Sequence, residues 1–222
     1  LIHQGHPASQ IEVVEPWAEA REALRKNYGI EAQAEAGPAL QRAQIVVWAV
    51  KPQTFRDAAA QAKAHTQGAL HLSVAAGIRS DSIAQWLGTE RIVRTMPNTP
   101  ALVGKGMSAL YARPAVSAPE RQSIEAIMAT TGEFLWVDSE PQLDAVTALS
   151  GSGPAYVFYF LEAMTRAGTG MGLTEQQAHQ LAVGTFVGAS ELARRSDDPP
   201  SVLRQRVTSK GGTTYAALQS ME

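Results

Sequence analysis

The sequence contains no cysteine, so it offers no disulfide framework, no thiolate nucleophile and no thiolate metal ligand. This absence fits a reducing compartment, and we expect a cytoplasmic protein. Charge of either sign is sparse, because 18% of the residues are charged and the formal net charge is -2. Nucleic acids and anionic membranes require clustered Lys and Arg, so the composition favours a small-molecule partner instead.

Long apolar runs are also absent. The run from Ile45 to Val50 has the length of a strand and falls far short of the ~20 residues of a membrane-spanning helix. The histidines are scattered without converging acids, so we expect no metal site. What the chain does have is apolar bulk: 45% of its 222 residues are hydrophobic, enough for one large domain or two modest ones.

Strand and helix patterns alternate through the first half of the chain. A β-branched run at 11–14 precedes a helical pattern at 17–28 that Gly29 closes. Further strand patterns lie at 45–50, 70–74, 92–93, 107–111 and 134–137, and helical patterns at 38–43, 55–65, 81–87 and 119–130. Repeated βα units predict a Rossmann-like, doubly wound parallel sheet with helices on both faces.

Strand patterns end at Asp138. The remaining patterns are helical, at 143–149, 154–167, 175–195, 202–207 and 214–218, and Thr174 with Gln177 predicts a capping box for the longest of these helices. We therefore expect a Rossmann-like domain over 1–138 and a separate all-α domain over 139–222.

Ligands of such sheets bind at the carboxyl ends of the strands, so residues that follow strands are candidate site residues. Glu15 could hydrogen-bond the adenosine ribose of a dinucleotide, although an acid near a helix start needs no ligand to explain it. Lys51 could reach a phosphate or could simply be solvated. Ala76 would let backbone approach a ligand, or belong to a tight turn. Asn98, between two prolines, could bind a carboxamide or stiffen a loop.

Two glycine-rich segments mark the helical half. The segment Ser150-Gly151-Ser152-Gly153-Pro154 opens a long helix, which a capped helix start would also explain. The segment from Thr208 to Thr214 places two glycines and several hydroxyls ahead of another helix, where backbone N–H groups can converge on an anion. Its spacing is not that of a nucleotide-hydrolase phosphate loop, so we predict a carboxylate cradle.

Taken together, the segments at 49–52, 94–100, 149–156 and 207–214 resemble the pyrroline-5-carboxylate reductase family in order and spacing. The resemblance runs over essentially the whole chain. It implies a Rossmann-like domain, a helical domain that dimerises, and reduction of a cyclic imine to proline with a nicotinamide hydride. NADPH is the implied cofactor, NADH is possible, and a homodimer or higher homo-oligomer is implied.

The resemblance also assigns residues to the site. The dinucleotide would contact Ala49, Val50, Lys51, Ala76 and Asn98. The substrate carboxylate would contact Ser209, Gly211, Gly212, Thr213 and Thr214, with the Thr214 hydroxyl near the ring nitrogen as the catalytic group. Asp197 falls where the family often has an acid near the substrate.

The chain departs from the family pattern at both ends. It shows no glycine-rich turn G-x-G-x-x-[GA], so we expect it to begin near the end of the helix after that turn, and to stop at Met221-Glu222 short of the last dimerisation helices. Glu15 would repel a 2′-phosphate, which favours NADH, whereas the family leans toward NADPH. A related imine or hydroxy-acid reductase, and a non-catalytic truncated binding or oligomerisation module, remain alternatives.

Overall fold

The computed structural model describes residue 2 and residues 5–221. The chain divides into two compact units, Leu1–Pro154 and Ala155–Glu222. The first unit is built on a sheet of five strands, and the second is helical. This division lies later in the chain than residue 138, where the sequence analysis sets its boundary, because the first helical segments after the sheet pack with the strands.

The sheet has the consecutive order β1 (Ile45–Trp48), β2 (Leu70–Ser73), β3 (Ile92–Met96), β4 (Gly106–Ala112) and β5 (Gly132–Trp136). Three of the four strand pairs are parallel, and β3 pairs with β4 in antiparallel fashion. Only the nine residues 97–105 join β3 to β4. A parallel connection needs a crossover of about a dozen residues or more, so this short loop turns the chain back instead.

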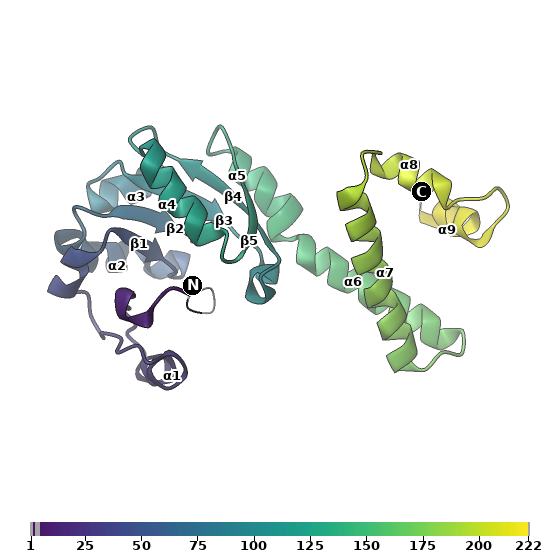
Figure 1. Ribbon diagram of the computed structural model, residues 1–222, viewed down its shortest axis with the longest axis horizontal. Coiled ribbons are helices and arrows are strands. Elements are labelled where there is room, and N and C mark those ends of the chain that lie inside the picture. The colour runs from purple at the N-terminus through teal and green to yellow at the C-terminus, as the bar shows by residue number, and fades with distance from the viewer. Residues whose placement is uncertain (1, 3–4, 222) are drawn as a thin grey trace. The chain divides into compact units, whose positions relative to one another are not determined.

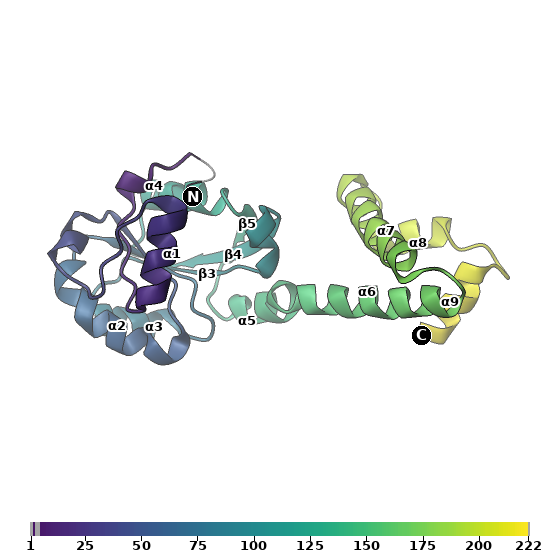
Figure 2. The same ribbon diagram turned by 90° about the horizontal axis from the view of Figure 1, so that it is seen from below.

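Helices cover both faces of the sheet, as the Rossmann-like prediction requires. Helices α2 (Phe55–Ala62) and α3 (Ser80–Leu87) lie on one face and α4 (Ala118–Met128) on the other (Figures 1 and 2). Helix α4 starts with a capping box, in which the Glu120 carboxylate accepts from the N–H and the hydroxyl of Ser117, each at 2.7 Å. The α/β class predicted from the sequence is confirmed.

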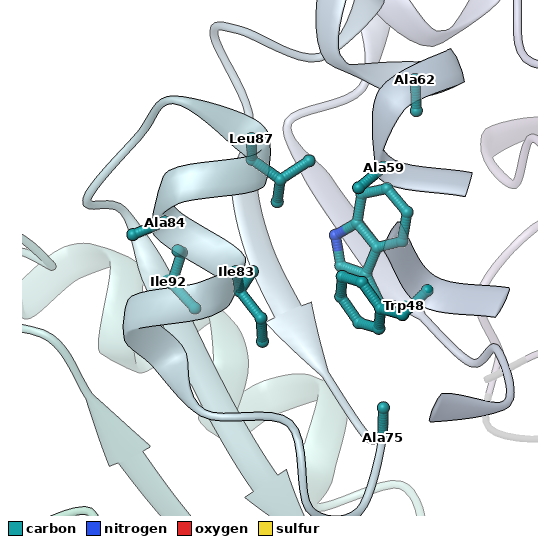
Figure 3. Close-up of a cluster of buried hydrophobic side chains, with 9 residues drawn as sticks. Trp48, Ala59, Ala62, Ala75, Ile83, Ala84, Leu87 and Ile92 are labelled. Atoms are coloured by element: carbon teal, nitrogen blue, oxygen red, sulfur yellow. The ribbon is translucent and has the colours of Figure 1, made fainter. Parts of the chain in front are cut away.

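The alternation of strand side chains divides the core into two layers. Ile92 points toward α2 and α3, and the next residue, Val93, points toward α4. In the first layer Ile83 and Leu87 of α3 face Trp48 at the end of β1 (Figure 3). The indole of Trp48 stacks on the ring of Phe55, with centroids 4.9 Å apart, and this pair fills the space between β1 and α2.

The prediction of a strand at 11–14 is wrong. Val14 forms only an isolated parallel bridge to Gln33, flanked by two backbone hydrogen bonds of 2.8 Å. A single bridging residue supplies too few ladder bonds to make a strand. Helix α1 (Ala18–Tyr28) follows and ends as predicted at Gly29, whose φ of 68° suits a left-handed C-cap.

Several predicted helices are shorter or tighter than expected. Residues 38–42 are 3₁₀ rather than α, as is the end of the helix predicted at 55–65, over 63–65. Further 3₁₀ turns, for which no helix was predicted, lie at 8–10, 52–54 and 99–103. The helix expected at 143–149 is α5 (Gln142–Val146) followed by a π-helical turn over Thr147–Gly151. Short 3₁₀ and π turns carry the same hydrophobic spacing as a short α-helix, so sequence periodicity does not distinguish them.

The second unit contains α6 (Gly153–Gly170), which begins at the boundary, α7 (Glu175–Arg195), α8 (Pro200–Arg206) and α9 (Thr213–Met221). The Thr174–Gln177 capping box at the start of α7 is confirmed. Helices α6 and α7 approach closely at Gly168, where a Cβ atom would lie 2.9 Å from that of Ala178. Within residues 2 and 5–221 we find no helix that is both long and apolar enough to cross a membrane.

Candidate functional site

The carboxyl ends of β1, β2 and β3 meet at one edge of the sheet, because these strands are parallel. Ala49, Val50 and Lys51 follow β1, and Ala76 follows β2. Of these, Ala49, Lys51 and Ala76 are exposed and Val50 is half-buried against the α2–α3 core layer. Small exposed residues let a ligand approach the backbone closely, and the Lys51 ammonium is a cation that suits the phosphates of a dinucleotide.

Asn98 follows β3 at the same edge, but its side chain is held by the protein itself. Its Nδ2 donates to the carbonyl and the hydroxyl of Ser150, each at 3.2 Å, and its Oδ1 accepts from the Met107 N–H at 2.9 Å. The amide thus joins the loop after β3 to the start of β4 and to the π-helical turn. This is the stiffening role that the sequence analysis left open beside the cofactor role.

Glu15 lies at the start of α1, where it also has a structural role. Its Oε1 accepts from the Trp17 N–H at 2.9 Å, and its own N–H donates to the Gln33 carbonyl. The Arg21 guanidinium donates through one nitrogen, Nη1, to the carbonyls of Glu15 and Pro16, at 2.9 and 2.7 Å. The guanidinium of Arg21 is therefore fixed on the backbone of the two residues that precede α1.

A buried polar network, absent from the sequence-based candidates, connects three elements of the first unit. The Glu140 carboxylate accepts from the Ser80 N–H and hydroxyl, at 2.6 and 2.7 Å, and from Arg94 at 2.5 Å. Burial alone would raise the pKa of Glu140, but the Ser80 hydrogen bonds and the Arg94 charge together hold this pKa below its ordinary value. The network anchors the start of α5 to α3 and β3, beside the loop that carries Ala76.

In the second unit the glycine-rich loop leads directly into α9. Gly211 has a φ of 76°, a value that favours glycine, and Gly212 donates its N–H to the Ser209 carbonyl at 3.0 Å. Because the first turn of a helix lacks internal acceptors, the N–H groups at the start of α9 are available to an anion. The loop residues Ser209, Gly211, Thr213 and Thr214 are exposed, and Gly212 is half-buried.

Asp197 lies in the turn between α7 and α8 and is exposed. Its neighbour Asp198 is the acid that forms an ion pair here, with Arg206 at 2.6 Å. The sequence assigned no role to Asp198, because it does not show which of two adjacent acids in a polar turn forms a contact.

The structure thus gathers two sets of predicted residues, each within its own unit. The set that follows the strands is Ala49, Val50, Lys51, Ala76 and Asn98, and the set around α9 is Ser209, Gly211, Gly212, Thr213 and Thr214. Sequence reasoning missed Glu140 and Arg94, for which the signal available was weak: Arg94 directly follows the strand pattern at 92–93, and a charged residue that extends a buried strand needs a buried partner.

Comparison with known proteins agrees with this arrangement. Residues 1–77 match a family model described as NADP oxidoreductase, coenzyme F420-dependent, and residues 140–222 match the model of the pyrroline-5-carboxylate reductase dimerisation domain. The Rossmann-like sheet and these matches define an oxidoreductase with a helical dimerisation domain.

Similar proteins identify the family. A pyrroline-5-carboxylate reductase of Pseudomonas aeruginosa is 43% identical over 224 aligned residues, which cover 100% of this chain and 82% of the relative. A structure of the reductase from Coxiella burnetii has a TM-score of 0.90 at 35% identity, covering 100% of this chain and 83% of that one. The Plasmodium falciparum enzyme, solved with NADP bound, has a TM-score of 0.81 at 30% identity, covering 88% and 74%. The chain belongs to the pyrroline-5-carboxylate reductase family.

Proposed function

We propose that this chain reduces pyrroline-5-carboxylate to proline with NADPH or NADH. The observation that carries the proposal is the 43% identity to a pyrroline-5-carboxylate reductase across the whole chain, which includes both the strand-end residues and the glycine-rich loop. The reaction adds one hydride to the imine carbon and one proton to the nitrogen. The dinucleotide supplies the hydride.

The residues of this chain would bind and orient the two reactants. Ala49, Val50, Lys51 and Ala76 would contact the dinucleotide, together with the backbone around Asn98, whose side chain already bridges two loops. Glu15 would contact the ribose. Hydride transfer needs the two reacting carbons about 3 to 3.5 Å apart, so most of the protein's contribution is orientation.

The substrate carboxylate would bind at the loop before α9. The N–H groups of the first α9 turn and the Ser209 and Thr213 hydroxyls are its donors, while Gly211 and Gly212 shape the loop. The Thr214 hydroxyl would hold the ring nitrogen and its proton. Asp197 would lie near the substrate in the assembled enzyme. Under this proposal residues 1–138 would bind the dinucleotide and residues 139–222 would bind the substrate.

The same proposal includes a homodimer in the cytoplasm. Support for the dimer comes from the aromatic side chains of α6, because Phe158, Tyr159 and Phe160 are more than half exposed within the chain. Large aromatic side chains exposed around so much of a helix are typical of a protein interface. We expect the mass in light scattering to be that of two copies or more, and Phe158→Glu to shift it toward one.

The test of the activity follows the loss of reduced-nicotinamide absorbance after pyrroline-5-carboxylate is added to the intact protein with NADPH or with NADH. We expect turnover and stoichiometric formation of proline. The Thr214→Ser variant keeps the hydroxyl and is expected to retain most of kcat, whereas Thr214→Val is expected to lose at least about tenfold. Absence of turnover with both cofactors would refute the proposal and favour a reductase for a different imine.

A further inference from the structure

We propose that Trp17, the N-cap of α1, and Arg21, in its first turn, recognise the adenosine end of NADPH, with Arg21 as the ligand of the 2′-phosphate and Trp17 as the stacking surface for adenine. The inference rests on the proposed use of a dinucleotide. It names the two residues that would decide how this chain chooses between NADPH and NADH.

Glu15 bears on the choice between NADPH and NADH. An acid that follows a strand in a Rossmann-like domain favours an unphosphorylated ribose, because a carboxylate repels a 2′-phosphate. In this chain the Trp17 N–H donates to Glu15 Oε1 at 2.9 Å, and the Arg21 guanidinium binds the carbonyl of the same residue, so a positive charge offsets part of the repulsion that Glu15 exerts. Glu15 alone therefore does not exclude the phosphorylated cofactor.

Arg21 has hydrogen-bond donors to spare. Its guanidinium lies against the backbone of Glu15 and Pro16, and both of its hydrogen bonds there use the same nitrogen, Nη1. Within residues 2 and 5–221 no acid forms an ion pair with Arg21. Its Nε and Nη2 groups are thus left to bind an anion beside Glu15, and a guanidinium fork matches a phosphate in geometry.

Trp17 offers an aromatic surface next to these donors in the chain. Its side chain is 68% exposed, which is a large apolar area to leave in water at the point where α1 begins. Trp17 is the N-cap of α1, and its carbonyl accepts from the Arg21 N–H at 3.0 Å, while the Arg21 guanidinium binds the carbonyl of the preceding residue, Pro16. Both residues therefore belong to the same end of α1. An exposed indole and an anchored guanidinium at one helix start are a combination that can bind an adenine ring and a neighbouring phosphate.

The test measures binding of adenosine 2′,5′-bisphosphate and of 5′-AMP to the intact protein by calorimetry. The two ligands share the adenine and differ by the 2′-phosphate, so their ratio reports on that phosphate alone. We expect Arg21→Ala to weaken the bisphosphate by about ten- to a hundredfold and 5′-AMP by less than about twofold. Trp17→Ala is expected to weaken both ligands by a similar factor of about ten.

Arg25→Ala is the matched control. Arg25 lies on the same helix one turn further and already pairs with Glu22 at 2.5 Å, so its loss should change neither affinity. The kinetic counterpart is kcat/KM with the two cofactors, which should fall for NADPH and stay constant for NADH in the Arg21 variant.

The inference is overturned if Arg21→Ala weakens both ligands equally, since that is the result of a purely structural role in α1. It is also overturned if the unaltered protein binds the bisphosphate no more tightly than 5′-AMP. These results are independent of imine reduction, so a failure of the proposed activity would leave the binding experiment decisive.

Discussion

Acidification between pH 7 and pH 5 should destabilise this protein through one buried histidine. His71 lies in β2 and is 1% exposed. Its Nδ1 accepts a 3.0 Å hydrogen bond from the Trp48 indole, which also stacks on the imidazole. Burial lowers the pKa of His71 from 6.5 to about 4, while its hydrogen bond with the backbone of Thr66 opposes this shift and the Arg91 charge adds to it.

The sign of the effect follows from proton binding. The unfolded chain takes up a proton on this histidine below about pH 6.5, whereas the folded protein does so only near pH 4. The stabilisation is therefore present above pH 6.5 and is lost as the pH falls through that window. Linkage gives a loss of about 2 kcal/mol between pH 7 and pH 5, and about 3 kcal/mol in full.

The assay is urea unfolding at fixed protein concentration at pH 7 and at pH 5. The control is His71→Asn, which keeps an acceptor for the Trp48 N–H and removes the titrating ring. We expect the unaltered protein to lose about 2 kcal/mol more than this variant over the two pH units, equivalent to roughly 4 to 8 °C in Tm. An equal pH dependence in both proteins would refute the reasoning.

Three further predictions concern the fold and the site. Gly132→Ala should destabilise the first unit by more than about 3 kcal/mol in denaturant unfolding, because a Cβ would lie 2.1 Å from the Gly106 carbonyl oxygen and the φ of Gly132 is 143°; a loss below 1 kcal/mol would contradict the close approach. Glu140→Ala should cost about 3 to 5 kcal/mol in the same assay, since it leaves Arg94 buried without its partner; restored stability in the double variant that also changes Arg94 to Met would support this cause. Gly212→Val should raise KM for the imine with little change in dinucleotide binding, because its Cβ would lie 2.6 Å from the Ser209 hydroxyl; equal losses in both would contradict the carboxylate role.

Much of the fold could be predicted because its signals are local. The apolar run from Ile45, the Gly29 stop and the Thr174–Gln177 box each specify one element, and the structure contains all three. Strand direction is not local. The reversal between β3 and β4 depends on the length of the loop that joins them, and the alternation of βα units alone does not reveal it.

The site could be predicted in its backbone parts and less well in its side chains. A glycine-rich loop ahead of a helix points to an anion whatever its neighbours are, so the loop before α9 was accessible from the sequence. The use of Asn98 depends on Ser150, a residue 52 positions away, and that of Glu140 depends on Ser80 and Arg94. Contacts between residues so far apart follow from tertiary structure and carry no pattern in the chain.

The bridge from Asn98 to Ser150 has a consequence for the order of folding. The bond closes a loop of 52 residues that contains β4, α4 and β5, and closing so long a loop costs chain entropy before any contact repays it. Local helices need no such closure, and the β4–β5 pair, which joins Gly106 to Gly132, closes a loop only half as long. The π-helical turn should therefore dock late, after the rate-limiting barrier, so that the amide of Asn98 slows unfolding rather than speeding folding.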